Sequence, residues 1–330
     1  MSNLYITKQN TKLSKKGKRI VVKEEGKIIS DIPLINIEQV VVFGRVSITG
    51  AMIQLLLGEG IPITYLSYYG NYKGRLVPEY SKNSIFRIKQ FRAYEDENFC
   101  LDISKRMIKG KLKNMRSFLL IEARKNKKDK IKEVCEKIKR TINKLEQADN
   151  LEKIRGYEGI ASKYYFSKFN AVLDDEFNFD GRNRRPPKDP INSMLSFGYC
   201  LLLNNVLTAL YLNGFDPYIG FFHSVQYGKV SLALDLIEEF RQVIIDRLIK
   251  SLVNREMITK GDFIKKENKV LMKDKARNLF LESYEEKLET TIEHPVFKIK
   301  ASWRKIIELQ AKLLRKHIKK EEIYQPMLVR

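Results

Sequence analysis

The stretch PINSMLSFGYCLLLNNVLTALYLNGF, residues 190–215, contains no charged residue. It is long enough to cross a bilayer, but the adjacent Asn204 and Asn205 would be costly in the middle of a lipid membrane. A helix that is apolar around nearly its whole circumference is typical of the centre of a soluble protein, and we predict a core helix here. Asp189 is expected to cap its start, and Pro190 suits the first helical position.

The chain changes character upstream of this helix, near residue 84. Residues 1 to about 80 contain short β-branched runs broken by Gly, Pro and Asn, which is typical of strands. From residue 84 onward, long helical periodicity with few breakers predominates. We predict an α+β fold, with a small β-rich N-terminal domain over 1–83 and a larger all-α domain over 84–330. Helices are expected near residues 85–97, 98–127, 130–147, 150–170, 190–213, 231–251, 270–286 and 298–318.

The composition narrows the functional class. Sixty-two basic against 40 acidic residues leave a formal charge of +22, which favours a polyanionic partner such as nucleic acid. The three cysteines are far apart and lack zinc-site spacing, and the N-terminus has no apolar signal core, so we expect a cytoplasmic protein with reduced thiols. The sequence lacks the GxxxxGK[ST] and GxGxxG loops that bind nucleotide phosphates, the HExxH motif and the GxSxG motif. Their absence argues against the commonest nucleotide-hydrolysing enzymes, dehydrogenases, zinc proteases and serine hydrolases.

Acidic residues within an apolar helix are the main candidates for chemistry. In GFFHSVQYGKVSLALDLIEEFR, residues 220–241, Asp235 lies three residues before Glu238 and four before Glu239. Either glutamate could share a helix face with Asp235, and spacing alone does not choose between them. An exposed acidic stripe is the plain alternative. Glu158 offers a second carboxylate, on a predicted helix face with Ala161 and Tyr165.

Two carboxylate-bearing helices and the loop histidine His223 could together enclose a divalent cation. Carboxylates suit Mg²⁺ or Mn²⁺, and one imidazole shifts the balance towards tolerance of Mn²⁺. A metal beside a basic surface suggests phosphodiester chemistry.

Several ordered blocks resemble the CRISPR-associated integrase family, Cas1, which inserts new spacers into CRISPR arrays. GYEGIASKYYF is similar to the family's first acidic block, and RNRRPPKDPINSMLSFGYCLL to its Arg–Pro–Pro–Asp–Pro–Asn block. GFDPYIGFFHSVQYGKVSLALDLIEEFR resembles its histidine-to-acid block. The closing HPVFKIKASWRKIIELQAKLLRKHI and YQPMLVR also look like the family. The likeness is strongest over residues 150–330.

The resemblance implies specific roles. The metal-binding positions fall on Glu158, His223 and Glu238, which favours Glu238 over Glu239, while Asp235 matches a further catalytic position that ligates directly or supports a ligand. Nucleic-acid contacts are expected in the helical, catalytic domain, where Arg241 matches a basic position of the family. Arg182, Arg184 and Arg185 are further candidates for phosphate contacts, and pairing with the nearby acidic residues is the alternative. Tyr165 could position a strand end near the metal, and core packing is the alternative.

The implied reaction is metal-dependent transesterification, in which the 3′-hydroxyl ends of short duplex DNA are joined to the CRISPR array. The implied partners are double-stranded DNA (protospacer and CRISPR repeat) and a small CRISPR-associated protein, Cas2, with no membrane. A homodimer is expected, with the N-terminal domain as its interface. The alternatives are a non-catalytic DNA-binding scaffold and a stand-alone metal-dependent nuclease acting on branched DNA.

Overall fold

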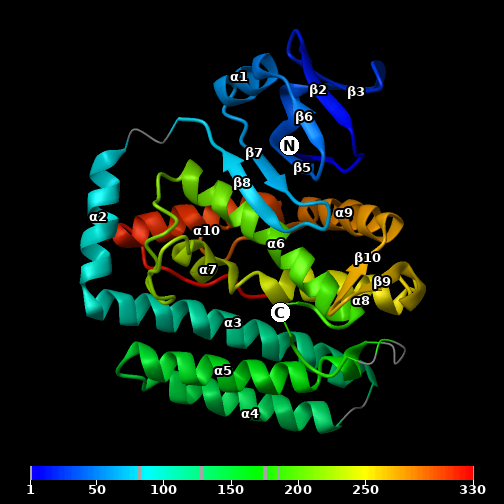
Figure 1. The fold of residues 1–330 in the computed structure, drawn as a ribbon. Coiled ribbons are helices and arrows are strands. Elements are labelled where there is room, and N and C mark those ends of the chain that lie inside the picture. Colours follow the sequence, from blue (N-terminus) through cyan, green and yellow to red (C-terminus); the bar gives the residue numbers. More distant parts are fainter. Residues whose placement is uncertain are drawn as a thin grey trace. The chain divides into compact units, whose positions relative to one another are not determined.

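The computed structural model describes residues 2–79, 83–126, 129–173, 177, 179–183 and 186–329 of the 330-residue chain. It divides into two compact units. The first comprises Met1–Tyr80 together with Arg277–Glu285, and the second comprises Ser81–Ala276 and Glu286–Arg330. The α+β prediction is confirmed, since strands dominate the first unit and helices the second (Figure 1).

The first unit is built from two four-stranded sheets, one complete helix and the Arg277–Glu285 segment of a second helix. One sheet has the order β1-β5-β7-β8, with β1, β5 and β7 parallel, and the other has the order β4-β3-β2-β6. Helix α1 (Gly50–Gly58) is capped by Thr49, whose side chain accepts a hydrogen bond from the Met52 amide. The strands are β1 (Ser2–Ile6), β2 (Thr11–Lys16), β3 (Arg19–Glu24), β4 (Lys27–Pro33), β5 (Ile37–Phe43), β6 (Val46–Ile48), β7 (Ile63–Leu66) and β8 (Tyr72–Leu76).

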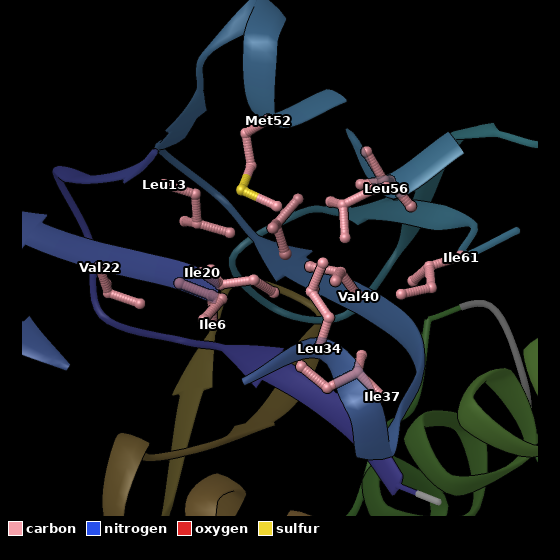
Figure 2. Close-up of a cluster of buried hydrophobic side chains, with 12 residues drawn as sticks. Ile6, Leu13, Ile20, Val22, Leu34, Ile37, Val40, Met52, Leu56 and Ile61 are labelled. Atoms are coloured by element: carbon pink, nitrogen blue, oxygen red, sulfur yellow. The ribbon is translucent and has the colours of Figure 1, made fainter. Parts of the chain in front are cut away.

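Branched aliphatic side chains from both sheets fill the core of this unit, and Met52 and Leu56 of α1 join them (Figure 2). Strand β5 is buried along almost its entire length, which fits a β-branched run between two parallel neighbours. A segment from far along the chain completes the unit. The Glu285 carboxylate accepts hydrogen bonds from the Asn3 amide (3.3 Å) and the Tyr5 hydroxyl (2.8 Å).

The second unit is mainly helical, and its first long helices α3, α4 and α5 lie side by side (Figure 1). The predicted helices are present, with boundaries within a few residues of those expected, except that the predicted 231–251 helix is divided. The helices are α2 (Ser84–Glu95), α3 (Glu97–Asn126), α4 (Asp129–Glu146), α5 (Leu151–Ser167), α6 (Pro190–Leu212), α7 (Ser231–Ile237), α8 (Arg247–Asn254), α9 (Asp274–Glu289) and α10 (Trp303–Ile318). Residues Arg277–Glu285 of α9 belong to the first unit.

Helix α6 is the central helix that the uncharged stretch predicted. The Asp189 side chain accepts a hydrogen bond from the Asn192 amide at its start, and Pro190 occupies the first turn. Among the described residues, α6 is the one helix long and apolar enough to span a membrane, but 67% of its most apolar window is buried inside the protein. Its apolar surface is therefore used for core packing against α7 and α10.

Three features of the helical unit were not predicted. Short antiparallel pairs form between β9 (Phe263–Lys266) and β10 (Lys269–Met272), and between β11 (Thr291–Glu293) and β12 (Lys300–Ser302). A π-helical turn, Arg241–Asp246, separates α7 from α8. Such turns are frequent at functional sites, because they re-aim the side chains that precede and follow them.

Candidate active site

Asp235 organises the histidine loop. It is fully buried on α7, and its Oδ2 accepts hydrogen bonds from the backbone amides of Phe221 (2.6 Å) and Phe222 (3.0 Å). Its Oδ1 accepts one from the His223 amide (2.9 Å) and lies 2.7 Å from His223 Nδ1. These contacts occupy both oxygens, so Asp235 positions His223 and leaves Nε2 as the free ring nitrogen.

Gly220 is required for this close approach of loop and helix. A Cβ atom built there would lie 2.6 Å from the Ser231 carbonyl carbon, 2.8 Å from the Leu232 amide nitrogen and 2.7 Å from Asp235 Oδ2. Any side chain would push the loop away from α7, and the amide cradle around Asp235 would open. Steric crowding against α7 therefore explains why the GFFH sequence begins with a glycine.

Glu158 and Glu238 are brought together by a lysine. Glu158 lies on α5 and Glu238 directly follows α7, and Lys111 of α3 reaches both carboxylates. The Lys111 ammonium contacts Glu158 Oε1 and lies 2.6 Å from Glu238 Oε2. Ser162 Oγ also donates a hydrogen bond to Glu158 Oε1, at 2.8 Å. The Lys111–Glu238 contact lacks hydrogen-bond geometry, so it acts through charge, and Glu238 Oε2 is left without a hydrogen bond.

Glu238 is strongly ionised despite being 95% buried. Burial by itself raises the pKa of Glu238, but the positive charges of Arg241 and Lys111, together with His223, outweigh it and lower the pKa to about 2. Arg241 Nη2 lies 3.4 Å from Glu238 Oε1, and its guanidinium stacks 4.5 Å from the Tyr199 ring centroid. This part of the site is therefore a carboxylate surrounded by cations.

His223 also faces open space. It lines a cavity of about 650 Å³ together with the aromatic rings of Phe221 and Phe222. Arg155, which also lines the cavity, holds the loop, since its Nη2 donates a hydrogen bond to the Phe222 carbonyl at 2.9 Å. The His223 side chain keeps 26% of its surface exposed, so a substrate group can reach it.

The expectation that Tyr165 contacts nucleic acid is wrong. Tyr165 is fully buried, and its hydroxyl donates a 2.7 Å hydrogen bond to Asp246 Oδ2, while Tyr199 donates to Oδ1 at 2.7 Å. A ring enclosed on all sides has no surface to offer a DNA strand. Burial raises the pKa of Asp246 to about 6, against the opposing effect of the two tyrosine hydrogen bonds.

The candidate DNA-binding arginines divide into two groups. Arg182 is engaged inside the protein, since its Nη1 donates to Asn192 Oδ1 at 2.7 Å and its Nη2 to Ser196 Oγ at 3.2 Å. These hydrogen bonds fix the loop before α6. A DNA contact by Arg182 stays a prediction. Arg184 and Arg185 lie outside the described residues. Arg241 is the one predicted arginine that the structure places next to the acidic residues.

Glu239, the residue after Glu238, serves a different region. It is fully buried and accepts hydrogen bonds from the Tyr324 hydroxyl, from Gln310 Nε2 (2.8 Å) and from the Met327 amide (2.6 Å). All three donors are neutral, and burial raises the pKa of Glu239 to about 7. Asn114 of α3 also bonds the carbonyls of Glu239 and Met327. This tail pocket, formed by Glu239, Gln310, Tyr324, Met327 and Asn114, fastens the C-terminal segment.

Lys111 was missed by reasoning from sequence, although a signal was present. On α3 it shares a buried face with Ile108, Leu112 and Met115, all at least 99% buried, and is itself 5% exposed. A charged residue within an apolar helical stripe is the same feature that singled out Asp235. Applied to lysine, the rule would have marked Lys111 as a buried cation that requires an anionic partner.

The donors fit a divalent cation, although they do not enclose one in this arrangement. Within the described residues, no three His, Cys, Asp or Glu side chains are close enough to hold a metal ion. The two carboxylates are instead joined by the Lys111 ammonium, and Glu238 Oε2 is buried without a hydrogen bond. The cation found between these oxygen donors in the structure is therefore the Lys111 ammonium.

Comparison with known proteins shows the family of the chain. The family model of CRISPR-associated protein Cas1 matches residues 4–286. The CRISPR-associated endonuclease Cas1 3 of Thermus thermophilus is 37% identical over 330 aligned residues, covering 99% of this chain and 97% of the relative. The CRISPR-associated endonuclease Cas1 of Leptospira interrogans is 42% identical over 237 residues, covering 69% and 93%.

Solved structures share the fold along nearly the whole chain. A Cas1 protein from Thermotoga maritima superposes with a TM-score of 0.85 at 28% identity, covering 99% of this chain and 100% of that one. A casposase bound to its integration product has a TM-score of 0.88 at 24% identity, covering 99% and 93%, and shows likeness of fold alone. By family model, sequence identity and fold, the chain belongs to the Cas1 family of CRISPR-associated proteins, of which the Thermus thermophilus and Leptospira interrogans relatives are named endonucleases.

Proposed function

We propose that this protein is the integrase of CRISPR adaptation, joining the 3′-hydroxyl ends of short duplex DNA to the CRISPR array by metal-dependent transesterification. The observation that carries the proposal is that Glu158 and Glu238 meet at Lys111, in the same unit as the held His223, and that all three lie on the blocks that resemble the family's catalytic ones. The formal charge of +22 suits a DNA-binding enzyme.

Glu158, His223 and Glu238 would hold Mg²⁺ or Mn²⁺, which would supply charge stabilisation at the scissile phosphodiester. The residues of the chain prepare this chemistry. Asp235 holds His223 Nδ1, so that Nε2 is the nitrogen available for a ligand or a proton. The pKa of Glu238, near 2, keeps this carboxylate ionised at neutral pH. Arg241, close to Glu238, would contact a DNA phosphate beside the reacting group.

The partners follow from the reaction. Two strand ends must reach two active sites at a set separation, so we propose a homodimer whose interface lies in the β-rich unit, and a small CRISPR-associated partner, Cas2, that joins two dimers. Solved structures of similar fold include a Cas6-RT-Cas1–Cas2 complex, in which the protein of similar fold assembles with Cas2. Action on array DNA implies a cytoplasmic location.

The proposal is tested by strand transfer. A labelled short duplex with free 3′-hydroxyl ends is incubated with a supercoiled plasmid carrying the array, the partner protein and Mg²⁺ or Mn²⁺. We expect labelled plasmid with wild type, and loss of about 10³-fold or more with Glu238→Gln and with His223→Ala, because each change removes a proposed ligand of the metal ion that would act on the reacting phosphate.

Glu239→Gln is the matched control, because it makes the same chemical change one residue away. Activity per folded molecule should stay within about tenfold of wild type, since Glu239 contacts only the tail pocket. Wild type that binds DNA without ever joining it would favour a scaffold. Cleavage of branched DNA without the partner, and no joining with it, would favour a stand-alone nuclease.

A further inference from the structure

We infer that the Lys111 ammonium is an internal competitor of the divalent ion: it occupies the cation position between Glu158 and Glu238, and a metal ion binds by displacing it. The inference rests on the proposed metal site. Its structural basis is the ion bridge of Lys111 to both carboxylates, which come from two different helices. Within the described part of the chain, only Lys111 forms an ion pair with both.

The burial of Lys111 makes this bridge more than a surface contact. The side chain of Lys111 is 6% exposed, that of Glu238 is 7% exposed and that of Glu158 is 23% exposed. Surface ion pairs contribute little, but a buried charge left without a partner is costly. Without Lys111, the metal-free protein would hold two carboxylates close together with only Arg241 near one of them. The bridge therefore keeps the empty site electrically balanced.

Lys111 and a divalent ion exclude each other. Both would occupy the space between Glu158 Oε1 and Glu238 Oε2, and a divalent ion in contact with these oxygens would repel an ammonium at the same place. Metal binding must therefore include the cost of breaking two buried ion pairs. Lysine suits such an exchange, because its ammonium is a compact charge on a flexible four-carbon stem.

The displaced ammonium needs a new anionic partner. In the proposed reaction, the phosphate backbone of DNA is the anion that reaches this site, and a lysine can bind it as a point charge. Metal binding should then be tighter when DNA is present than when it is absent. Lys111 would thus tie loading of the metal to arrival of the substrate, and would limit metal-dependent cleavage by the free protein.

The inference is tested by metal binding without any reaction. EDTA-stripped full-length protein, free of DNA, is titrated with MnCl₂ by calorimetry. We expect Lys111→Met to bind Mn²⁺ at least about tenfold more tightly than wild type, because the apolar side chain removes the competing charge. The metal-free variant should melt at a lower temperature than wild type, and Mn²⁺ should raise its melting temperature more.

Lys109→Met is the control, since Lys109 lies on the same helix but pairs with Glu146 at the surface, and it should leave Mn²⁺ affinity unchanged. In the Lys111→Met/Glu238→Gln double variant the gain should disappear. If Lys111→Met does not fold, Lys111→Arg serves instead, because a guanidinium fork grips two carboxylates more firmly and should weaken Mn²⁺ binding.

Unchanged or weaker Mn²⁺ binding by folded Lys111→Met would overturn the inference, as would Lys111→Arg binding at or above wild-type affinity. Strand transfer by wild type in the same Mn²⁺ buffer separates this failure from failure of the proposed function. If wild type joins DNA and Lys111→Met shows no gain, only the competitor role is wrong. If Glu238→Gln changes neither joining nor Mn²⁺ binding, the proposed metal site itself is wrong.

Discussion

Glu238 and Glu239 are neighbours in sequence, and both are buried, yet they belong to two different regions of the molecule. Glu238 faces the cationic centre formed with Lys111, Arg241 and His223, and its pKa is lowered to about 2. Glu239 faces the tail pocket, where its donors are neutral and its pKa is raised to about 7. Burial opposes ionisation in both cases.

The contrast shows that partner charge, rather than depth, decides the ionisation of a buried carboxylate here. Cations outweigh desolvation at Glu238, whereas three neutral donors at Glu239 offset only part of it. A carboxylate that stays ionised can bind a cation, and a bound cation can take part in chemistry at a substrate phosphate. A carboxylate that shares its oxygens among backbone and side-chain donors is suited to fasten the C-terminal segment.

The largest effect is expected when the cationic centre is disturbed and the tail pocket is left intact. Gly220→Ala places a methyl group within 2.8 Å of α7 backbone atoms, so the loop must move and His223 loses its hold on Asp235. We expect strand transfer to fall by about 100-fold and stability by about 1–3 kcal/mol. Hydrogen exchange of the Met327 amide, bonded to Glu239, should be unchanged.

Gly156→Ala is the matched control, because a Cβ atom there meets nothing within 4 Å. It lies on α5, two residues before Glu158, and should leave strand transfer unchanged and stability the same or slightly higher. Full strand transfer by folded Gly220→Ala would show that the amide cradle around Asp235 is not needed for the reaction.

The next effect is on stability as a function of pH in metal-free protein. The folded pKa of Glu239 is raised, so its contribution is fully present below its unfolded value of 4.5 and is lost as pH rises through 7. Relative to Glu239→Gln, wild type should therefore lose about 3 kcal/mol of unfolding free energy between pH 5 and pH 8. Urea unfolding followed by circular dichroism measures the difference.

The contribution of Glu238 to stability should depend on pH in the opposite direction, and at lower pH. Its folded pKa is depressed, so its contribution is present above 4.5 and is lost as pH falls toward 2. Relative to Glu238→Gln, wild type should lose stability only on acidification below pH 4.5. A stability difference between wild type and Glu239→Gln that is constant from pH 5 to pH 8 would contradict the assignment of Glu239 to a neutral pocket.

The smallest effect concerns Asp246, a second buried carboxylate held by hydroxyl donors. Tyr165→Phe removes one of its two tyrosine hydrogen bonds and should cost about 1–3 kcal/mol of unfolding free energy, while DNA affinity measured by fluorescence anisotropy stays unchanged. Tyr164→Phe, next to it and not fully buried, should cost less than about 0.5 kcal/mol. Weaker DNA binding by Tyr165→Phe would support a contact between Tyr165 and DNA, which the burial of this side chain argues against.

Structure could be predicted from the sequence where the pattern that specifies an element lies within that element. The cap at Asp189, the uncharged run of α6 and the change from strands to helices near residue 84 are local patterns, and the structure confirms each of them. The division of the 231–251 helix by a π-helical turn was not foreseen, because its hydrophobic pattern continues through the break. The pairing of β9 with β10 was missed, since each strand has only four residues.

The sequence by itself predicted a β-rich part followed by a helical part and a resemblance to the Cas1 family, because each signal lies in residues close together in the chain. The site roles of Glu158, His223 and Glu238 stay predictions. Only the tertiary structure decided their surroundings. It brought Lys111, 47 residues before Glu158 and on another helix, between two carboxylates, and it turned Glu239 toward a tail some 85 residues later. The partner of a buried charge is fixed only when distant segments of the chain pack together. The spacing of residues along the chain does not show which of them will come into contact.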